Sequence, residues 1–240
     1  MIYVYGVVHD GALPRPALDG VDGDPVSTVA HDGIAALVSQ APERPRLRRA
    51  ELFRHLRVLE RACAETTVVP CAFGSVADSP AVLCDELLAS RHEELLGLLG
   101  RLEGRVQLNV KAEHDEETVL REVLAEEPEI ARLRARTKSR GAEAYHEQLA
   151  LGELVAAAVA ARRERDAARL LDALLDPAED VAVETAAEHL VLKAAFLVRR
   201  AEVERFDHAL ETFARSQAGR LQLEVIGPVP PTAFASIGGD

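Results

Sequence analysis

The sequence predicts an α+β protein of two domains, and three observations support this prediction. Strand-like segments, rich in β-branched residues or alternating in polarity, occur near both ends of the chain. A long stretch with apolar residues at helical spacing lies between them. The length of 240 residues suits two compact units of roughly 100 to 130 residues each.

The N-terminal domain is expected to span residues 1–113 and to begin with strands. Residues 2–8 (IYVYGVV) contain the β-branched and aromatic residues typical of a strand. Residues 26–30 and 33–39 then predict a hairpin, because Asp32–Gly33 is a sequence that favours a tight turn between two strands.

Helices and strands alternate in the rest of this domain. Residues 46–64 predict an amphipathic helix, and a short apolar piece at 67–70 follows it. Ser79 should cap a second helix that continues to about Leu102. Residues 106–110 alternate apolar with polar side chains, as a half-buried strand does. This order of elements predicts a ferredoxin-like sheet with helices on one face.

The C-terminal domain is expected to span residues 114–240. Its helical segment covers about 115–176, and an α+β unit covers about 180–240. In that unit we expect two strands, a helix and a last strand, a second ferredoxin-like ββαβ pattern, with ranges 180–186, 190–198, 200–217 and 221–225. The Pro-rich tail after this strand is expected to be irregular, because proline removes donors from a β-ladder.

Composition and charge exclude several classes of function. The formal net charge is −12, which disfavours a general nucleic-acid binder or a polybasic membrane anchor. The N-terminus turns polar too soon for a signal peptide. No run approaches the ~18 consecutive apolar residues of a membrane-spanning helix. These features lead us to expect a cytoplasmic protein without a membrane span.

The sequence offers no recognisable catalytic, metal or cofactor site. The 8 histidines are scattered and form no metal-binding motif. The 3 cysteines lack CxxC spacing and are expected to be reduced thiols. Phosphate-binding loops and nucleophile elbows are absent from the sequence. A catalytic pair of a carboxylate and a histidine, brought together only by folding, remains as an alternative.

Two non-helical segments are more informative than these residues. Pro70–Gly74 places an aromatic residue and a glycine in a tight connection, and Gly227–Phe234 (GPVPPTAF) is a stiff, extended strip. Both could be connectors whose Phe73 and Phe234 fill the core. Alternatively, they could form a preordered binding surface, since extended Pro-rich segments lose little entropy when they dock.

Taken in order, these segments resemble the gas vesicle protein F/L family. The matching positions that carry the resemblance, and that we consider candidate partner-binding residues, are Tyr5, Gly6, Pro70, Phe73, Gly74, Phe196, Gly227, Pro228, Pro231 and Phe234. Two departures stand out: Ala72 replaces an arginine of the family's loop, and Thr232–Ala233 replace a Tyr-Ser pair of its tail.

The resemblance implies a role in making gas vesicles, the hollow protein shells that give buoyancy. It implies an accessory protein, without enzymatic activity or cofactor, that binds the major shell protein and other accessory proteins. It also implies a location at the gas vesicle and a two-domain, ferredoxin-like fold. We expect a monomer. The alternatives are a minor structural component of the vesicle wall and, in another class, a hydrolase-like enzyme with a carboxylate and histidine cleft.

Overall fold

A computed structural model describes residues 1–12, 18–41, 49–140, 145–185, 187, 189–235 and 237 of the chain. The chain divides into two compact units, Met1–Leu108 with Gly227–Asp240, and Asn109–Ile226. This division groups the tail with the N-terminal unit, whereas the sequence analysis grouped it with the C-terminal domain. The expected helix start at residue 46 and the expected strand end at residue 186 lie outside the described residues.

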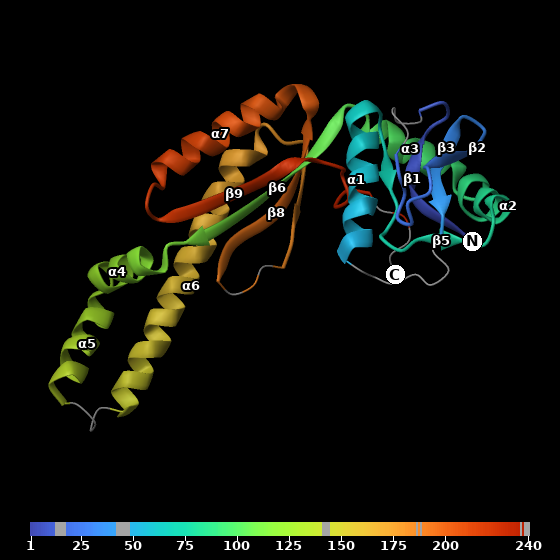
Figure 1. Ribbon diagram of the computed structural model, residues 1–240. Helices are drawn as coiled ribbons and strands as arrows, with labels where there is room; N and C mark the ends of the chain where they lie inside the picture. Colours follow the sequence, from blue (N-terminus) through green and yellow to red (C-terminus); the bar gives the residue numbers. More distant parts are fainter. Residues whose placement is uncertain are drawn as a thin grey trace. The chain divides into compact units, whose positions relative to one another are not determined.

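The N-terminal unit contains a sheet with the strand order β2-β3-β1-β4, and β5 also pairs with β1 (Figure 1). Its strands are β1 (Ile2–His9), β2 (Ser27–His31), β3 (Ile34–Gln40), β4 (Val69–Pro70) and β5 (Val76–Ala77). Its helices are α1 (Arg49–Glu65), α2 (Pro80–Leu83), the π-helical η1 (Cys84–Ala89) and α3 (His92–Leu102).

Local signals in this unit are confirmed. Strands β2 and β3 pair antiparallel on either side of Asp32–Gly33, as predicted. The hydroxyl of Ser79 accepts a hydrogen bond from the backbone N–H of Val82 at 3.2 Å, so Ser79 caps α2 with Pro80 in its first turn. The predicted second helix, however, is not continuous, because turn residues separate η1 from α3.

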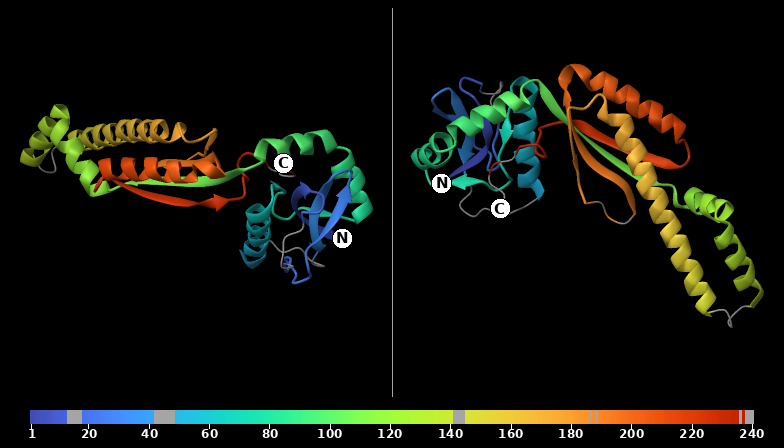
Figure 2. Two further views of the ribbon diagram at one scale, coloured as in Figure 1. Left: turned by 90° about the horizontal axis from the view of Figure 1, so that it is seen from above. Right: turned by 180° about the vertical axis from the view of Figure 1, so that it is seen from behind.

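The prediction that helices cover one face of this sheet is wrong. Every residue of β3 from Ile34 to Ser39 is buried, although successive side chains point to opposite faces. Both faces are therefore covered. Helix α1 packs on β1, and the stretch from η1 to α3 contacts β1 and β3 (Figure 2). Each face of the sheet thus has its own apolar layer.

A second sheet, with the strand order β7-β8-β6-β9, lies mainly in the C-terminal unit, although residues 105–108 of β6 and 227–229 of β9 are grouped with the N-terminal unit. Its strands are β6 (Arg105–His114), β7 (Asp180–Val183), β8 (Leu190–Arg199) and β9 (Leu221–Val229). Its helices are α4 (Glu116–Glu126), α5 (Pro128–Arg140), α6 (Tyr145–Leu175), the 3₁₀ turn η3 (Arg200–Glu202) and α7 (Val203–Ser216). Helices α6 and α7 contact each other and β8, and they lie on the same face of the sheet (Figures 1 and 2).

The predicted strand at residues 106–110 belongs to this second sheet, not to the first. It forms part of β6, which lies between β8 and β9. The predicted alternation is present, since Val106, Leu108 and Val110 are buried. A pattern of alternation identifies a strand with one buried face, but it does not identify the strands that pair with it.

The expectation that residues 226–229 are irregular is also wrong, because β9 continues to Val229 through Pro228. Strand β9 is at the edge of the sheet, and an edge strand tolerates proline because one side of its backbone has no neighbouring strand. The helical prediction for 115–176 is confirmed by α4, α5 and α6. Asp115 caps α4 by accepting a hydrogen bond from the N–H of Thr118 at 2.9 Å.

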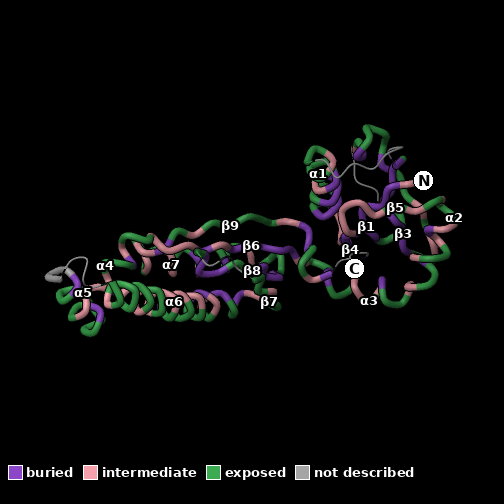
Figure 3. Tube along the Cα trace, turned by 90° about the horizontal axis from the view of Figure 1, so that it is seen from below, coloured by how far each residue is buried: buried purple, intermediate pink, exposed green. Residues whose placement is uncertain are grey.

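The long helix α6 is exposed or half-buried over most of its length (Figure 3). Its first half packs half-buried apolar side chains, among them Leu154 and Val155, against buried Val119 and Val123 of α4 and Ile130 of α5. Among the described residues, no helix is both long enough and apolar enough to cross a membrane.

Candidate partner-binding site

The two segments that the sequence analysis singled out lie side by side in the N-terminal unit. Cys71 and Ile237 form a parallel β-bridge. The N–H of Ile237 donates to the carbonyl of Pro70 at 3.0 Å, and the N–H of Ala72 donates to the carbonyl of Ile237 at 2.9 Å. The Pro-rich tail therefore pairs with the chain at the end of β4, along the edge of the first sheet.

The path of the tail is fixed on its other side by β6. The side-chain carbonyl of Gln107 accepts a hydrogen bond from the N–H of Ala233 at 2.9 Å. Gly227 has φ +152°, and a Cβ there would lie 2.8 Å from the carbonyl oxygen of Gln107 and 2.7 Å from Cδ2 of Leu108. Only glycine fits this approach. Of the other tail residues, Pro231 is buried, Phe234 is half-buried and Pro228 is exposed.

Beneath the loop lies a buried cluster of aromatic rings around His55. Nδ1 of His55 is 3.1 Å from the hydroxyl of Tyr3, which accepts a hydrogen bond from the N–H of Gly74 at 2.9 Å. The ring of Phe73 meets His55 edge-on, with centroids 5.6 Å apart. Burial lowers the pKa of His55 to about 4 and raises the pKa of Tyr3 to about 12. Both side chains are therefore neutral at pH 7.

Tyr5 and Gly6 are part of the same support. The hydroxyl of Tyr5 is 2.8 Å from that of Ser39 and accepts a hydrogen bond from the N–H of Val21 at 2.8 Å. Gly6 pairs with Pro70, and a Cβ at Gly6 would lie 2.7 Å from the carbonyl oxygen of Val69. Gly6 thus lets β1 and β4 approach closely, whereas the hydroxyl of Tyr5 joins β1 to Ser39 of β3 and to Val21.

Cys71 is not a reactive thiol. It is 4% exposed, and burial raises its pKa to about 12, so the nucleophilic thiolate is not populated near pH 7. The described residues also contain no group of three or more His, Cys, Asp or Glu side chains that could hold a metal ion. Residues of the loop and the tail also line a surface of the N-terminal unit.

That surface is a hollow of about 330 Å³ between β5, the helical stretch α2–η1 and the tail. Its apolar lining comes from Val4, Val76, Val82, Leu83, Leu87 and Ile237. Two carboxylates, Asp78 and Glu86, also line it. Val76 is 43% exposed, so part of this apolar lining is open to solvent. The arrangement suits an apolar side chain or segment with a positive charge beside it.

Phe196 does not belong to this surface. It lies in the C-terminal unit on β8, where it is fully buried, pairs with Val181 and meets the ring of Phe206 with centroids 5.2 Å apart. Of the candidate residues, those from Tyr5 to Gly74 and from Gly227 to Phe234 lie in the N-terminal unit, whereas Phe196 packs in a separate core.

The sequence analysis missed a charged cluster in the C-terminal unit. Nε2 of His114 is 3.0 Å from Oδ2 of Asp166, and Nη2 of Arg220 is 3.1 Å from the same oxygen. Nε of Arg220 also donates to both carboxylate oxygens of Glu122 at 2.8 and 3.0 Å. Although burial opposes its charged form, these carboxylates raise the pKa of Arg220. These residues come from distant parts of the chain, so no local motif marks them.

Comparisons with known proteins cover nearly the whole chain. It is 39% identical over 236 residues to Gas vesicle protein F of Streptomyces sp. (strain CB03234), covering 97% of this chain and 98% of that protein. It is 26% identical over 241 residues to Gas vesicle protein F of Nostoc sp. (strain PCC 7120 / SAG 25.82 / UTEX 2576), covering 98% of each. The crystal structure of GvpF from Anabaena sp. PCC7120 matches with a TM-score of 0.88 at 25% identity and covers 99% of both chains.

These matches confirm the fold as a mixture of helices and antiparallel sheet. The family model for "Gas vesicle synthesis protein GvpL/GvpF" matches residues 1–236. The resemblance found in the sequence is therefore confirmed, and with it a role in gas vesicles and a location at these structures. The chain belongs to the gas vesicle synthesis protein GvpL/GvpF family.

Proposed function

We propose that the chain is a non-enzymatic accessory protein of gas vesicle assembly that binds the major shell protein and other accessory proteins. The observation that carries the proposal is the partly exposed apolar hollow beside the loop and the tail, in a chain of the gas vesicle family. We infer that the shell subunit presents an apolar segment to its partner before it is assembled into the wall. The hollow gives such a segment an apolar surface to contact.

The charges around the hollow favour a partner with a basic residue beside its apolar segment. Asp78 and Glu86 both line the hollow, and the chain as a whole carries a net charge of −12. Ala72 stands where the family's loop has an arginine, so this chain lacks a positive charge in the loop. We infer that this chain recognises its partner through apolar contact and through acidic residues, with no contribution from that arginine.

We also infer that each compact unit is a domain and that the C-terminal one is ferredoxin-like. The strand order β9-β6-β8-β7 supports this, because a βαββαβ chain of the ferredoxin type has the fourth strand beside the first and the third strand between the first and the second. The helices between β6 and β7 and the helix α7 between β8 and β9 occupy the two crossover positions.

We propose that the protein works as a monomer.

The test is binding between the purified full-length chain and the major shell protein, measured by co-purification of a tagged copy. We expect retention of the shell protein at micromolar concentration. No retention at that concentration would contradict the proposed function.

The second candidate is a minor component of the vesicle wall, which would use the same apolar contact permanently. Antibody detection on purified and washed vesicles separates the two. An assembly accessory protein is removed by washing, whereas a wall component stays with the vesicles in constant proportion.

An enzyme is the least supported of the candidates. Cys71 in the loop is protonated, and His55 on α1 is buried within a ring cluster. The carboxylate and histidine pair that does occur, Asp166 with His114, is buried and bonded to Arg220. We therefore assign no catalytic role to either group.

A further inference from the structure

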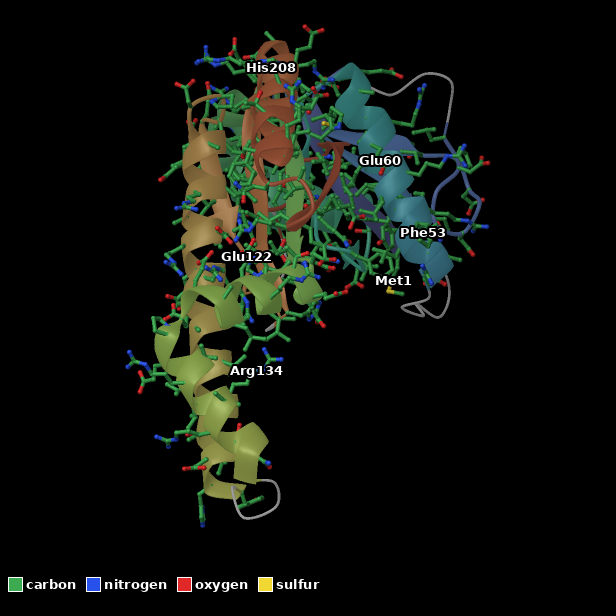
Figure 4. All side chains as sticks on the ribbon, turned by 90° about the vertical axis from the view of Figure 1, so that its left-hand side faces the viewer. Met1, Phe53, Glu60, Glu122, Arg134 and His208 are labelled. Carbon is green, nitrogen blue, oxygen red and sulfur yellow. The ribbon has the colours of Figure 1, made fainter. Side chains whose placement is uncertain are left out.

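A second hollow, of about 300 Å³, lies within the C-terminal unit and differs in chemistry from the first. It is lined by charged side chains of α4, of α6 and of the residue that precedes β9. Figure 4 shows Glu122 on α4, next to α6. Four of the lining residues are arginines, namely Arg162, Arg165, Arg169 and Arg220. The other three are carboxylates, so the hollow has one positive charge in excess, in a chain whose net charge is −12.

Each of the three carboxylates is already engaged. Glu122 accepts from Nε of Arg220, and Asp166 accepts from Nη2 of the same arginine at 3.1 Å. Glu126 accepts from Nη2 of Arg162. These contacts account for the negative charge of the hollow. They also explain why the carboxylates do not form a cation site, because their oxygens are directed at guanidinium groups.

Arg162 has an unused donor in this hollow. The residue is 9% exposed, and its Nη1 atom is buried without a hydrogen-bond partner among the described residues. The carboxylate oxygen Oε2 of Glu122 is 3.9 Å from Nη1, which is too far for a hydrogen bond. A buried guanidinium N–H without an acceptor is unfavourable, so the position favours an acceptor group brought in from outside.

Arg165 and Arg169 complete the cationic side of the hollow. Both are exposed residues of α6, one turn apart. Nη1 of Arg169 is 3.7 Å from Oδ1 of Asp166, beyond hydrogen-bond distance, and Nε of Arg165 donates to the carbonyl of Ala161 at 3.3 Å. Their guanidinium groups are thus available on the solvent side, while Arg162 lies beneath.

We propose that this hollow, which we call the arginine hollow, binds a phosphate-type oxyanion. The tetrahedral anion accepts a hydrogen bond from Nη1 of Arg162 at the base and further hydrogen bonds from Arg165 and Arg169 at the mouth. Arginine suits this task because its planar, permanently charged group matches phosphate oxygens in pairs. The ligand is either free phosphate or the phosphate group of a nucleotide.

The test is calorimetric titration of the full-length chain with inorganic phosphate at constant ionic strength, with chloride as the reference anion. We expect saturable binding of phosphate and none of chloride. A parallel titration with ATP distinguishes the sources: tighter binding of ATP indicates a nucleotide, and equal or weaker binding indicates free phosphate. If the heat released or absorbed on titration with phosphate is no larger than that with chloride, the proposal is overturned.

Matched variants locate the binding. Arg169→Ala should weaken phosphate affinity roughly tenfold or more, because it removes a charged donor from an exposed position that the fold does not need. Arg163→Ala removes the same charge from the same helix, but Arg163 does not line the hollow. The phosphate affinity of this variant should therefore stay within about twofold of that of the parent. Equal effects of the two variants would show only a general response to net charge and would refute the site.

Discussion

The backbone N–H of Ile237 donates a hydrogen bond to the carbonyl of Pro70 at 3.0 Å. This contact joins the Pro-rich tail to the last residue of β4, and Ile237 itself is 5% exposed. The tail is therefore part of the N-terminal fold, and its last described residue forms one wall of the apolar hollow.

Replacing Ile237 with alanine should destabilise the N-terminal unit. The change keeps the backbone hydrogen bonds but removes apolar side-chain atoms from the wall of the hollow that Ile237 lines together with Val4 and Leu83, so we expect the free energy of unfolding to fall by about 2 to 4 kcal/mol. Urea denaturation measures this. Leu52→Ala, at a site 36% exposed on α1, is the control and should change stability by no more than about 0.5 kcal/mol. Similar losses in both variants would show that the tail does not contribute specifically.

Gly227 should not accept any side chain. Gly227→Ala puts a methyl group against the carbonyl oxygen of Gln107, and we expect a loss of about 1 to 3 kcal/mol in the free energy of unfolding. Gly97→Ala is the matched control, because no atom lies within 4 Å of the added Cβ on the exposed side of α3. That change should stabilise the protein by roughly 0.5 to 1 kcal/mol. Thermal unfolding of the two variants should shift in opposite directions, and a shift in the same direction would contradict the geometry.

The burial of His55 predicts a loss of stability in mild acid. Its pKa is about 4 in the folded protein, below the ordinary value of 6.5, so the unfolded chain binds the proton more readily. The contribution of neutral His55 to the free energy of unfolding is fully present above pH 6.5. It is lost as the pH falls to about 4, and the loss amounts to about 3 kcal/mol. Denaturation at a series of pH values tests this.

The variant His55→Gln should lack this part of the pH dependence, because glutamine does not titrate. His9→Gln changes an exposed histidine of the same unit and should keep the full dependence. If the two variants had the same slope between pH 6.5 and 4, another group would be responsible.

Phe196 should affect stability but not recognition. Its ring packs against Phe206 within the C-terminal unit, so Phe196→Leu should lower the free energy of unfolding by about 1 to 2 kcal/mol. Because the apolar hollow lies in the other unit, affinity for the shell protein should not change. If the variant stays folded by circular dichroism but no longer binds the shell protein, the prediction is contradicted and Phe196 contributes to binding.

Much of the fold could be predicted from the sequence because the signals are local. The Asp32–Gly33 turn, the Ser79 cap and the alternation of β6 each depend on a few neighbouring residues. Pairing between distant segments could not be predicted in this way. The assignment of 106–110 to the second sheet and the continuation of β9 through Pro228 depend on which strands lie at an edge.

The candidate site was predictable only in part. The sequence identified the loop and the tail as unusual, but nothing local indicates that Ile237 pairs with Pro70 and Ala72. The arginine hollow had no sequence signal, because its arginines follow helical charge patterns that are common on solvated surfaces. Only the folded chain brings Arg162 and Arg220 together around the same carboxylate, that of Glu122.

The most direct test of the account is the affinity of the Val76→Asp variant for the major shell protein. Val76 is 43% exposed in the apolar hollow, so a carboxylate there must be desolvated against the apolar segment of the partner, which opposes binding with little cost to folding. Val183→Asp is the matched control, since Val183 is 57% exposed on β7 in the other unit. In a co-purification or surface-binding measurement, we predict that Val76→Asp weakens binding at least tenfold, roughly the effect of a buried unpaired charge, while Val183→Asp binds like the parent. Unchanged binding by Val76→Asp, or an equal loss in both variants, would contradict the assignment of the apolar hollow as the binding surface.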